Sequence, residues 1–442
     1  MIATKLPTLL NEEQALSLIE SVIEKSVAEG VFISIDASES ALSRFSENQI
    51  SQNLNKTRFQ LTITSYFGKR SASASTTEMD PEAITDTLKR SEILARFAPE
   101  DPEWVPLLAP QIYPDAKAAF DQATASLSPL VRGEMVQEVC SLSRNAGVNG
   151  SGTLSTAANI QAIGNSVGVR AYNQITEADF SFTAKQDNGS GWSNKTAWNI
   201  GDLLLPEMTE EAIARALASR NPKEVQPGTY PVVFSAPAFA SLLSWVVWSL
   251  DARAADEGRS FMSKENGNKV GEQLFSPILQ VQRDRAHPLL QLGTFFGDGL
   301  SNNYLEIIKD GIPQTLSYSR YWAQQQGKQP TGSMYPIVMT GSDRSLTDLI
   351  AQTERGILVN RLWYLGYVNP RTLEVTGMTR DGTFWIENGK IAYPIKNLRF
   401  NQNLPEMLRD VEAVSQVQRC RSSVVPGVKV RAFNFSSVTD SV

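Results

Sequence analysis

The sequence predicts an α+β protein: an N-terminal α+β domain, a β-rich middle and a β-rich C-terminal domain. Three observations support this fold class. Helical and strand periodicities alternate in the first hundred residues, residues 150–200 combine Ser, Thr, Asn and Gly with alternating apolar positions, and the chain after Gly258 is β-rich and punctuated by glycine. At roughly 100–200 residues per domain, 442 residues suffice for two or three domains. We place these domains at residues 1–110, 111–225 and 226–442.

The N-terminal domain should begin with a helix that is capped at Asn11, with Gln14 completing a capping box. Its apolar positions have helical spacing and end at Gly30. Strands are expected at residues 31–36, 58–66 and 71–76. Asp80 and Pro81 are the N-cap and first-turn residues of a second helix, which should run to about Phe97.

The Pro-rich stretch 98–114 should link this domain to the middle region. Ser128 and Pro129 begin another helix, residues 150–200 should form an antiparallel meander, and residues 203–220 should be helical before a boundary at 222–228. The C-terminal domain should open with a strand at 229–235 and an apolar helix at 236–250. In that helix Trp245 and Trp248 share a face and are expected in the core. Residues 426–438 should form a last pair of strands.

Histidine and cysteine are almost missing from this chain. His287 is the single histidine, and Cys140 and Cys420 are the two cysteines. A catalytic zinc site needs about three protein ligands, mostly His and Cys, and a Ser-His-Asp site needs a well-placed base. His287 precedes a proline and is expected to be an exposed loop residue. Two distant cysteines cannot build a disulfide framework.

The charge of the chain argues against nucleic acid as a partner. The formal net charge is −6 and the sequence pI is about 5.2, without a run of basic residues. The sequence contains neither an apolar stretch of membrane-spanning length nor the pattern of a signal peptide, so we expect no membrane association and a cytoplasmic protein.

Few residues are candidates for chemistry. Gly293–Gly299 is glycine-rich but does not connect a strand to a helix, so phosphate binding is not expected. The carboxylates of Asp251, Asp256 and Glu257 could bind a hard cation, although a solvated helix end is the simpler interpretation. Cys420 lies between two arginines that could lower its pKa, but an inert thiol is favoured. The residues alone therefore predict no catalytic group, metal ligand set or cofactor.

Several segments together resemble the TldD/PmbA (TldD/TldE) family of peptidases, also called modulators of DNA gyrase. The resembling segments are Asn165-Ser-Val-Gly168, Gly228–Ser235 with the Ala/Leu-rich helix after it, Val270-Gly-Glu272 with Ser276-Pro277, Asp310-Gly-Ile-Pro313, Pro330-Thr-Gly332, Gly341–Ser345 through Val359, Trp385–Ile391 and Pro394-Ile-Lys396. Their order and spacing carry the resemblance, which covers most of residues 150–430.

The resemblance implies a relation to a two-subunit zinc peptidase. TldD-type subunits carry His-Glu-x-x-x-His on the helix that corresponds to residues 236–257, and a C-terminal cysteine as third ligand. The histidines would fall near Val247 and Ala252 and the glutamate near Trp248, so this chain lacks the motif, although Cys420 lies near the position of the zinc cysteine. This implies a PmbA/TldE-like subunit, and family dimers enclose a chamber for unfolded or extended peptides.

Three functions remain open at this stage. The first is a non-catalytic partner of a zinc-bearing TldD-type homologue in a cytosolic peptidase complex. The second is a homodimer that binds peptides or another ligand without peptidase activity. The third is an enzyme with non-zinc chemistry, for which Asp251, Asp256, Glu257 and Cys420 are the cleft candidates.

Overall fold

The computed structural model describes residues 9–114, 119–290 and 292–439. Within these residues the first layer is a six-stranded antiparallel sheet in the order β3-β2-β1-β4-β5-β6. Its strands are β1 (Gly30–Ser46), β2 (Gln49–Phe67), β3 (Arg70–Thr76), β4 (Asn149–Asn165), β5 (Arg170–Gln186) and β6 (Gly189–Ala197). β1 pairs with β4 from Phe32 to Phe45, so the expected boundary near residue 110 lies in a connection between two halves of one sheet.

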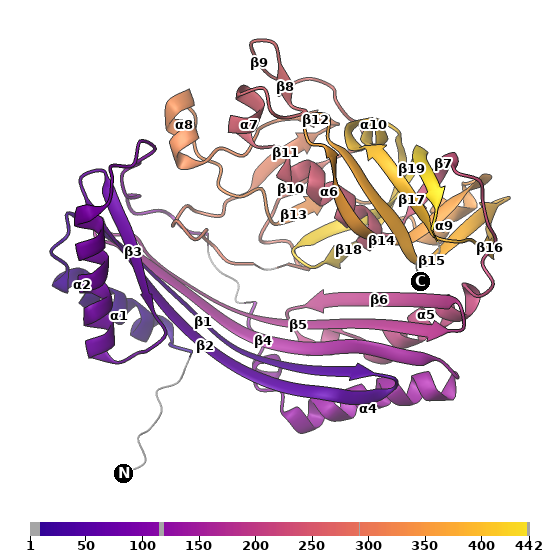
Figure 1. Ribbon diagram of the computed structural model, residues 1–442, viewed down its shortest axis with the longest axis horizontal. Helices are drawn as coiled ribbons and strands as arrows, with labels where there is room; N and C mark the ends of the chain where they lie inside the picture. Colours follow the sequence, from indigo (N-terminus) through magenta and orange to yellow (C-terminus); the bar gives the residue numbers. More distant parts are fainter. Residues whose placement is uncertain (1–8, 115–118, 291, 440–442) are drawn as a thin grey trace.

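Helices cover the convex face of this curved sheet (Figure 1). They are α1 (Glu12–Lys25), α2 (Pro81–Phe97), α3 (Gln122–Ala125), α4 (Pro129–Asn145) and α5 (Leu205–Ala218), with a short 3-10 turn at Ile200–Asp202. The predicted capping box is present, since Asn11 Oδ1 accepts from the Gln14 amide at 2.9 Å. Asp80 and Ser128 cap α2 and α4 as predicted.

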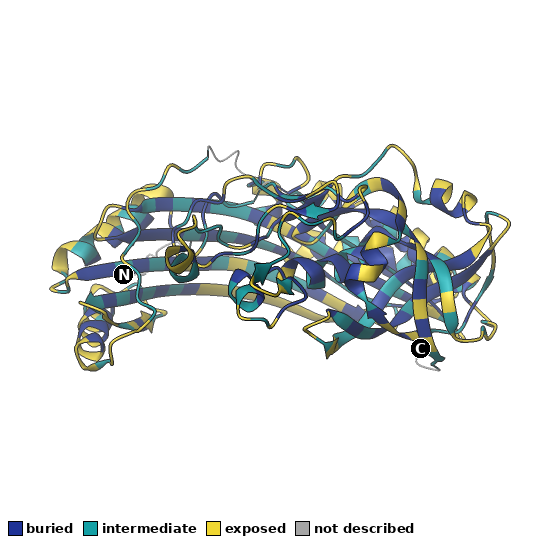
Figure 2. Ribbon diagram, turned by 90° about the horizontal axis from the view of Figure 1, so that it is seen from above, coloured by how far each residue is buried: buried dark blue, intermediate teal, exposed yellow. Residues whose placement is uncertain are grey.

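The two faces of the sheet have different chemistry because strand side chains alternate between them. On the convex side Ile33 and Ile35 pack with Ile19 of α1, and Phe180 and Phe182 pack near α4. This alternation is visible along the long strands in Figure 2. The concave face turns toward the C-terminal part of the chain. It carries a polar row that includes Asp36 and Gln161, and beside it Ile163 and Ala171 pack against Phe295 of that part.

The C-terminal unit contains an eleven-stranded mixed sheet within the described residues. Its strands are β7 (Gly228–Phe234), β10 (Val281–Arg283), β11 (Leu305–Lys309), β12 (Ile312–Pro313), β13 (Ile337–Met339), β14 (Arg355–Asn369), β15 (Glu374–Glu387), β16 (Lys390–Pro394), β17 (Leu398–Asn403), β18 (Val411–Cys420) and β19 (Ser423–Val438), and β8 (Ser263–Lys264) and β9 (Gly267–Asn268) form a small separate pair. Because β7 pairs with both β14 and β19, the strands β7, β14, β15, β17 and β19 close into a ring.

The helices of this unit are α6 (Ala236–Trp248), α7 (Ala252–Asp256), α8 (Arg320–Gln326), α9 (Leu346–Ala351) and α10 (Leu404–Arg409). The predicted α+β class is confirmed. In the described residues we find no helix with both the length and the apolar character that a membrane crossing requires.

Two predictions for this unit were wrong. The apolar helix ends at Trp248, because the chain turns at Ser249 and starts a new helix that Asp251 caps. The side chain of Trp248 therefore lies outside the core, and this residue is 74% exposed. Residues 426–438 do not pair with each other. They belong to one strand, β19, and its hairpin partner is the preceding strand β18, whose many polar residues concealed it.

Candidate functional site

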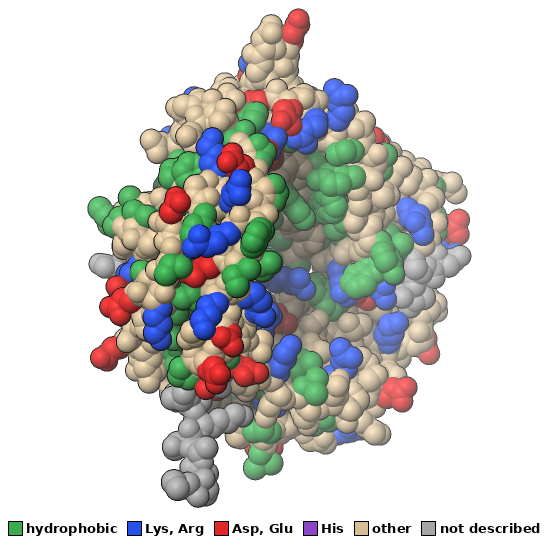
Figure 3. Space-filling model, turned by 60° about the vertical axis from the view of Figure 1, so that its left-hand side comes forward, with side chains coloured by type: hydrophobic (Ala, Val, Ile, Leu, Met, Phe, Trp, Pro, Cys, Tyr) green, Lys and Arg blue, Asp and Glu red, His purple; other side chains and the backbone are tan. Residues whose placement is uncertain are grey.

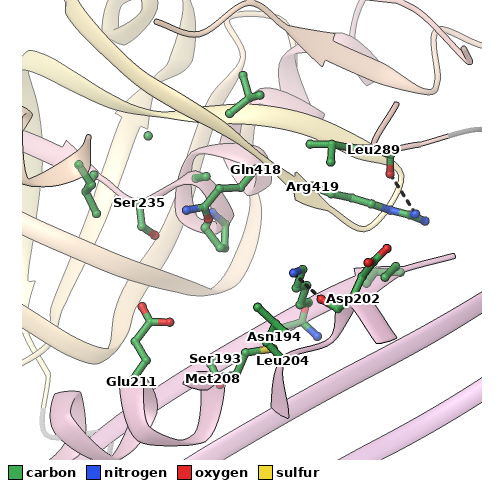
Figure 4. Close-up of a pocket in the computed structure, with 18 of the residues that line it drawn as sticks. Ser193, Asn194, Asp202, Leu204, Met208, Glu211, Ser235, Leu289, Gln418 and Arg419 are labelled. Carbon is green, nitrogen blue, oxygen red and sulfur yellow. Dashed lines mark hydrogen bonds between the residues drawn. The ribbon is translucent and has the colours of Figure 1, made fainter. Parts of the chain in front are cut away.

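A cleft of about 670 Å³ lies between the six-stranded sheet and the C-terminal unit. β6 and α5 form one wall, and β18 together with the start of α6 forms the other (Figure 4). Glu211 and Met208 of α5 lie on the first side, and Gln418 and Arg419 of β18 on the second. The space-filling view shows the molecule hollowed between its two halves, with Lys and Arg side chains near the rim (Figure 3).

The edge strand β6 presents main-chain groups to this cleft. Each residue of an antiparallel strand directs its N–H and C=O to one side, and the next residue directs them to the other. Ser190 bonds through both groups to Ser219 Oγ, and Trp192 O accepts from Arg215, so the even-numbered residues point away from β5. Asn194 and Thr196 follow in the same register, line the cleft, and have no main-chain partner among the described residues. This edge can therefore accept another strand.

An ion pair links the sheet to the opposite wall. Arg419 Nη2 lies 3.8 Å from Glu177 Oε2, and its Nη1 donates to Leu289 O at 3.1 Å. Burial lowers the pKa of Arg419 and raises the pKa of Glu177, while the charges of Arg419 and Glu177 favour ionisation of each other. The pair holds β18 over β5 and sets one end of the cleft.

A second link is made by the guanidinium of Arg361 on β14. It lies 4.2 Å from the ring centroid of Trp192 and 4.7 Å from that of Trp363, and it donates to Asp381 Oδ2 at 2.6 Å. Asp381 is 1% exposed, and Arg380 Nε lies 3.7 Å from the same carboxylate oxygen. Because Trp192 belongs to β6, the cluster fixes the edge strand against the C-terminal unit.

The three predicted carboxylates lie at α7, apart from the cleft wall, and each has a local partner. Asp251 Oδ1 caps α7 by accepting from the Ala254 amide at 2.7 Å. Asp256 accepts from Asn268 at 2.9 Å and from Trp322 at 2.8 Å. Hydrogen bonds from Arg253 and Arg259 lower the pKa of Glu257. No group of three or more His, Cys, Asp or Glu side chains suited to a metal ion occurs in the described parts of the chain.

Cys420 lies at the end of β18, and its thiol packs against the C-terminal core. Burial raises the pKa of Cys420 to about 12. This shift has the opposite sign to the one that the flanking arginines were expected to give, because desolvation penalises the thiolate.

The positions implied for a zinc motif do not fit the metal. Val247 is 1% exposed and Ala252 is fully buried, so both belong to the apolar core around α6. Trp248 is exposed at the surface. Burial keeps the thiol of Cys420, the residue near the position of the zinc cysteine, in its protonated form at neutral pH. Zinc requires nitrogen, sulfur or carboxylate ligands, and these three positions supply none.

Sequence reasoning missed the groups that build the cleft. The β6 edge and the Arg361 cluster join residues from distant parts of the sequence. The alternation of residues 189–197 could have indicated the strand, but not that it is an edge. His287 lies in a loop as expected and is partly buried, and its Nδ1 accepts from the Leu289 amide at 3.2 Å.

Comparison with known proteins identifies similar chains. Residues 227–437 match the family described as the PmbA/TldA metallopeptidase C-terminal domain. The chain is 25% identical over 401 residues to the Metalloprotease PmbA of Escherichia coli O157:H7, an alignment that covers 84% of this chain and 85% of the relative. It is 24% identical over 389 residues to a Metalloprotease PmbA homolog of Haemophilus influenzae, covering 83% of each chain.

Solved structures share the fold along nearly the whole chain. TldE from Thermococcus kodakarensis superposes with a TM-score of 0.87 at 19% identity, covering 95% of this chain and all of the other. A Bacteroides thetaiotaomicron protein whose name links it to modulation of DNA gyrase has a TM-score of 0.85 at 21% identity, covering 97% and 100%.

Proposed function

The chain belongs to the TldD/PmbA family, and from this premise we propose that it is the non-catalytic, TldE/PmbA-like subunit of a cytoplasmic metallopeptidase complex. Its partner in this proposal is a TldD-type homologue that carries the zinc ligands. The complex acts on unfolded or extended peptides, and this chain contributes part of the peptide-binding surface.

The observation that carries this proposal is the combination of an unpaired strand edge at β6 with a helix, α6, whose side chains pack in the apolar core and supply no metal ligand. The main-chain groups of Asn194 and Thr196 face a cleft of about 670 Å³ that suits an extended chain. Strand addition gives affinity through main-chain hydrogen bonds and so imposes little sequence selection. Around Val247 and Ala252, by contrast, α6 and α7 supply packing and no ligands, which supports the proposal that the hydrolytic chemistry belongs to the partner.

The role of the partner is tested by reconstitution. The chain purified alone should contain less than stoichiometric zinc and cleave no unfolded peptide, and activity should appear when the TldD-type homologue of the same organism is added. Activity of the homologue that is unchanged by this chain, or stoichiometric zinc in the isolated chain, would contradict the proposal. Recovery of a self-paired dimer alone from the source cell would favour a ligand-binding homodimer.

The role of the β6 edge is tested with Thr196→Pro and the matched control Thr196→Val. Proline removes an N–H that points away from β5, so the pairing within the sheet is retained. Valine removes the hydroxyl that donates to Asp179 and keeps the N–H. We expect peptide cleavage by the reconstituted complex to fall about tenfold for proline relative to valine, as expected for the loss of about 1.4 kcal/mol of binding. Equal activity of the two variants would exclude strand addition at this edge.

A further inference from the structure

A second pocket of about 460 Å³ lies on the concave face of the sheet. We call it the concave-face pocket. Its floor comes from β1, β2, β4 and β5, and its roof is formed by Gly293, Phe295 and Asn302 in the loop before β11. The volume is within the range of about 300–1,000 Å³ that is typical of small-ligand sites.

The floor of this pocket is a polar row that crosses four strands in register. Asp36 lies directly opposite Gln60 on one side and Gln161 on the other, and Gln161 lies opposite Asn173. Such cross-strand neighbours have Cβ atoms about 4.5–5.5 Å apart. Only Asp36 in this row is an acid; burial raises its pKa, and the hydrogen bond from Gln161 and the charge of Arg58 in the next row oppose that shift. The row thus presents alternating donors and acceptors with little net charge.

The roof loop is anchored to this floor and leaves one buried polar atom without a partner. Asn173 Oδ1 accepts from the amide and the hydroxyl of Thr294, each at 3.1 Å. Asn302 is 5% exposed; its Nδ2 donates to Gly293 O at 3.0 Å, while its Oδ1 has no hydrogen-bond partner. The unpaired buried carboxamide oxygen of Asn302 costs free energy, and this residue is one of those that line the pocket.

Glycine at position 293 keeps this space open. A Cβ at Gly293 would lie 2.7 Å from Asn173 Nδ2, whereas a Cβ at Gly297 in the same loop would meet nothing within 4 Å. The glycine-rich stretch, which the sequence did not assign to phosphate binding, therefore shapes the roof of a polar pocket.

We propose that the concave-face pocket binds the main-chain amide groups of an uncharged peptide segment, as a contact separate from the β6 edge. A side-chain carboxamide has an NH2 donor and a carbonyl acceptor in one plane and so matches a peptide group. Gln161 Nε2 already donates to Asp36 and Asn173 Oδ1 already accepts from Thr294, so the Gln161 carbonyl and the Asn173 NH2 are the groups offered to a ligand. Ile175 of this pocket lies on the same strand face as Glu177 and Asp179, and Asp179 pairs with Thr196, so the pocket and the cleft lie along the same face of β5 with the Arg419–Glu177 pair between them.

A sugar fits these observations less well. Saccharide recognition uses an exposed aromatic face, but Phe295 is 4% exposed and its ring already packs against Tyr113 with centroids 5.7 Å apart. The inference rests on the proposed peptide function, but its test uses the chain alone and needs no partner, zinc or cleavage. A negative result in this binding test therefore contradicts only the pocket proposal and leaves the outcome of the reconstitution experiment unaffected.

The test is a ligand-observed NMR titration of the full chain with N-acetyl-triglycinamide. N-acetyl-trisarcosinamide, which has methyl groups in place of the internal amide hydrogens, is the matched ligand control, and maltotriose represents the sugar class. We expect the triglycine probe to bind and the sarcosine probe and maltotriose to bind at least tenfold more weakly. Absence of triglycine binding, equal binding of the sarcosine probe, or preference for maltotriose would each overturn the proposal.

Variants assign the binding to this pocket. Gly293→Ala and Gln161→Met should each weaken triglycine binding at least tenfold, whereas Gly297→Ala should leave it unchanged. If both pocket variants bind the probe as the original chain does, or if Gly297→Ala weakens binding as much as they do, the probe occupies another site and the proposal fails.

Discussion

Burial controls the chemistry of Cys420 more strongly than the charges beside it. Its thiol packs against the C-terminal core, and burial raises the pKa to about 12. Since the thiolate is the reactive form, neither Cys420 nor the fully buried Cys140 should react with a disulfide reagent at pH 8 in the folded protein. Both thiols should react after unfolding, and in the variant Cys140→Ala the signal that remains comes from Cys420. Rapid native reaction of one thiol in this variant would contradict the expectation.

Asp36 should make stability depend on pH. Burial raises its folded-state pKa above the ordinary value of 3.8, so folding favours the protonated form. This contribution to stability is fully present below pH 3.8 and is lost as the pH rises through the folded-state pKa. Asp36→Asn should therefore match the original chain in urea unfolding at pH 3.5 and exceed its stability at pH 7. Glu39→Gln on the same strand is the control, and an equal effect of Asp36→Asn at both pH values would contradict this assignment.

Individual residues show which properties are local enough to predict. The caps at Asn11, Asp80 and Ser128 were predicted because each cap depends on residues within three positions. The exposure of Trp248 was not predicted, because it depends on where α6 ends. The arginines beside Cys420 could have lowered the pKa of its thiol, but the core that buries this thiol comes from distant strands and raises the pKa instead.

At the scale of elements, the contact of α5 with β6 depends on a glycine. A Cβ at Gly191 would lie 2.1 Å from Ala212 O and 2.6 Å from the Ala216 amide nitrogen, so alanine would push the helix away from the strand. We expect Gly191→Ala to lower the free energy of unfolding by about 1–3 kcal/mol. Gly133→Ala within α4 meets nothing within 4 Å and should raise it by about 0.5–1 kcal/mol. Urea denaturation measures both, and effects of the same sign would contradict the packing argument.

The sequence predicted most helices and the kinds of strand, but not all of their lengths or partners. Residues 31–36 were predicted as a strand from their apolar alternation, whereas β1 continues to Ser46 through mainly polar residues. The extension is stabilised by pairing with β4 more than a hundred residues later. The split between α6 and α7 was missed for a related reason: the bridge between Asp251 and Ser317 that holds it is non-local.

At the scale of the whole molecule, the candidate sites exist only where the two halves meet. The cleft takes one wall from β6 and the other from β18, and the concave-face pocket takes its roof from the C-terminal unit. Composition and spacing favoured the α+β class, and the order of short motifs favoured the family, but neither contains the relative position of two sheets. Several contacts between the halves set this position, among them the Arg361 cluster, the Arg419–Glu177 pair and the hydrogen bonds between Asn173 and Thr294.

Replacing Arg361 should loosen the joint between the halves. In Arg361→Ala the carboxylate of Asp381, which is 1% exposed, loses its nearest cation, and removal of one partner of a buried pair costs about 3–5 kcal/mol. Adding Asp381→Asn should recover part of this loss, because asparagine removes the charge and tolerates the positive φ of 53° at that position.

The measurement for Arg361 combines urea unfolding with amide hydrogen exchange of β6 and β15. Arg361→Lys is the control, since lysine keeps the positive charge but lacks the planar guanidinium that contacts the rings of Trp192 and Trp363. We expect exchange to accelerate most in the alanine variant, less in lysine, and to slow again in the double variant. If alanine destabilises the protein without faster exchange in β6, or if Asp381→Asn gives no recovery, the cluster does not hold the edge strand in place and the cleft geometry depends on the Arg419–Glu177 pair instead.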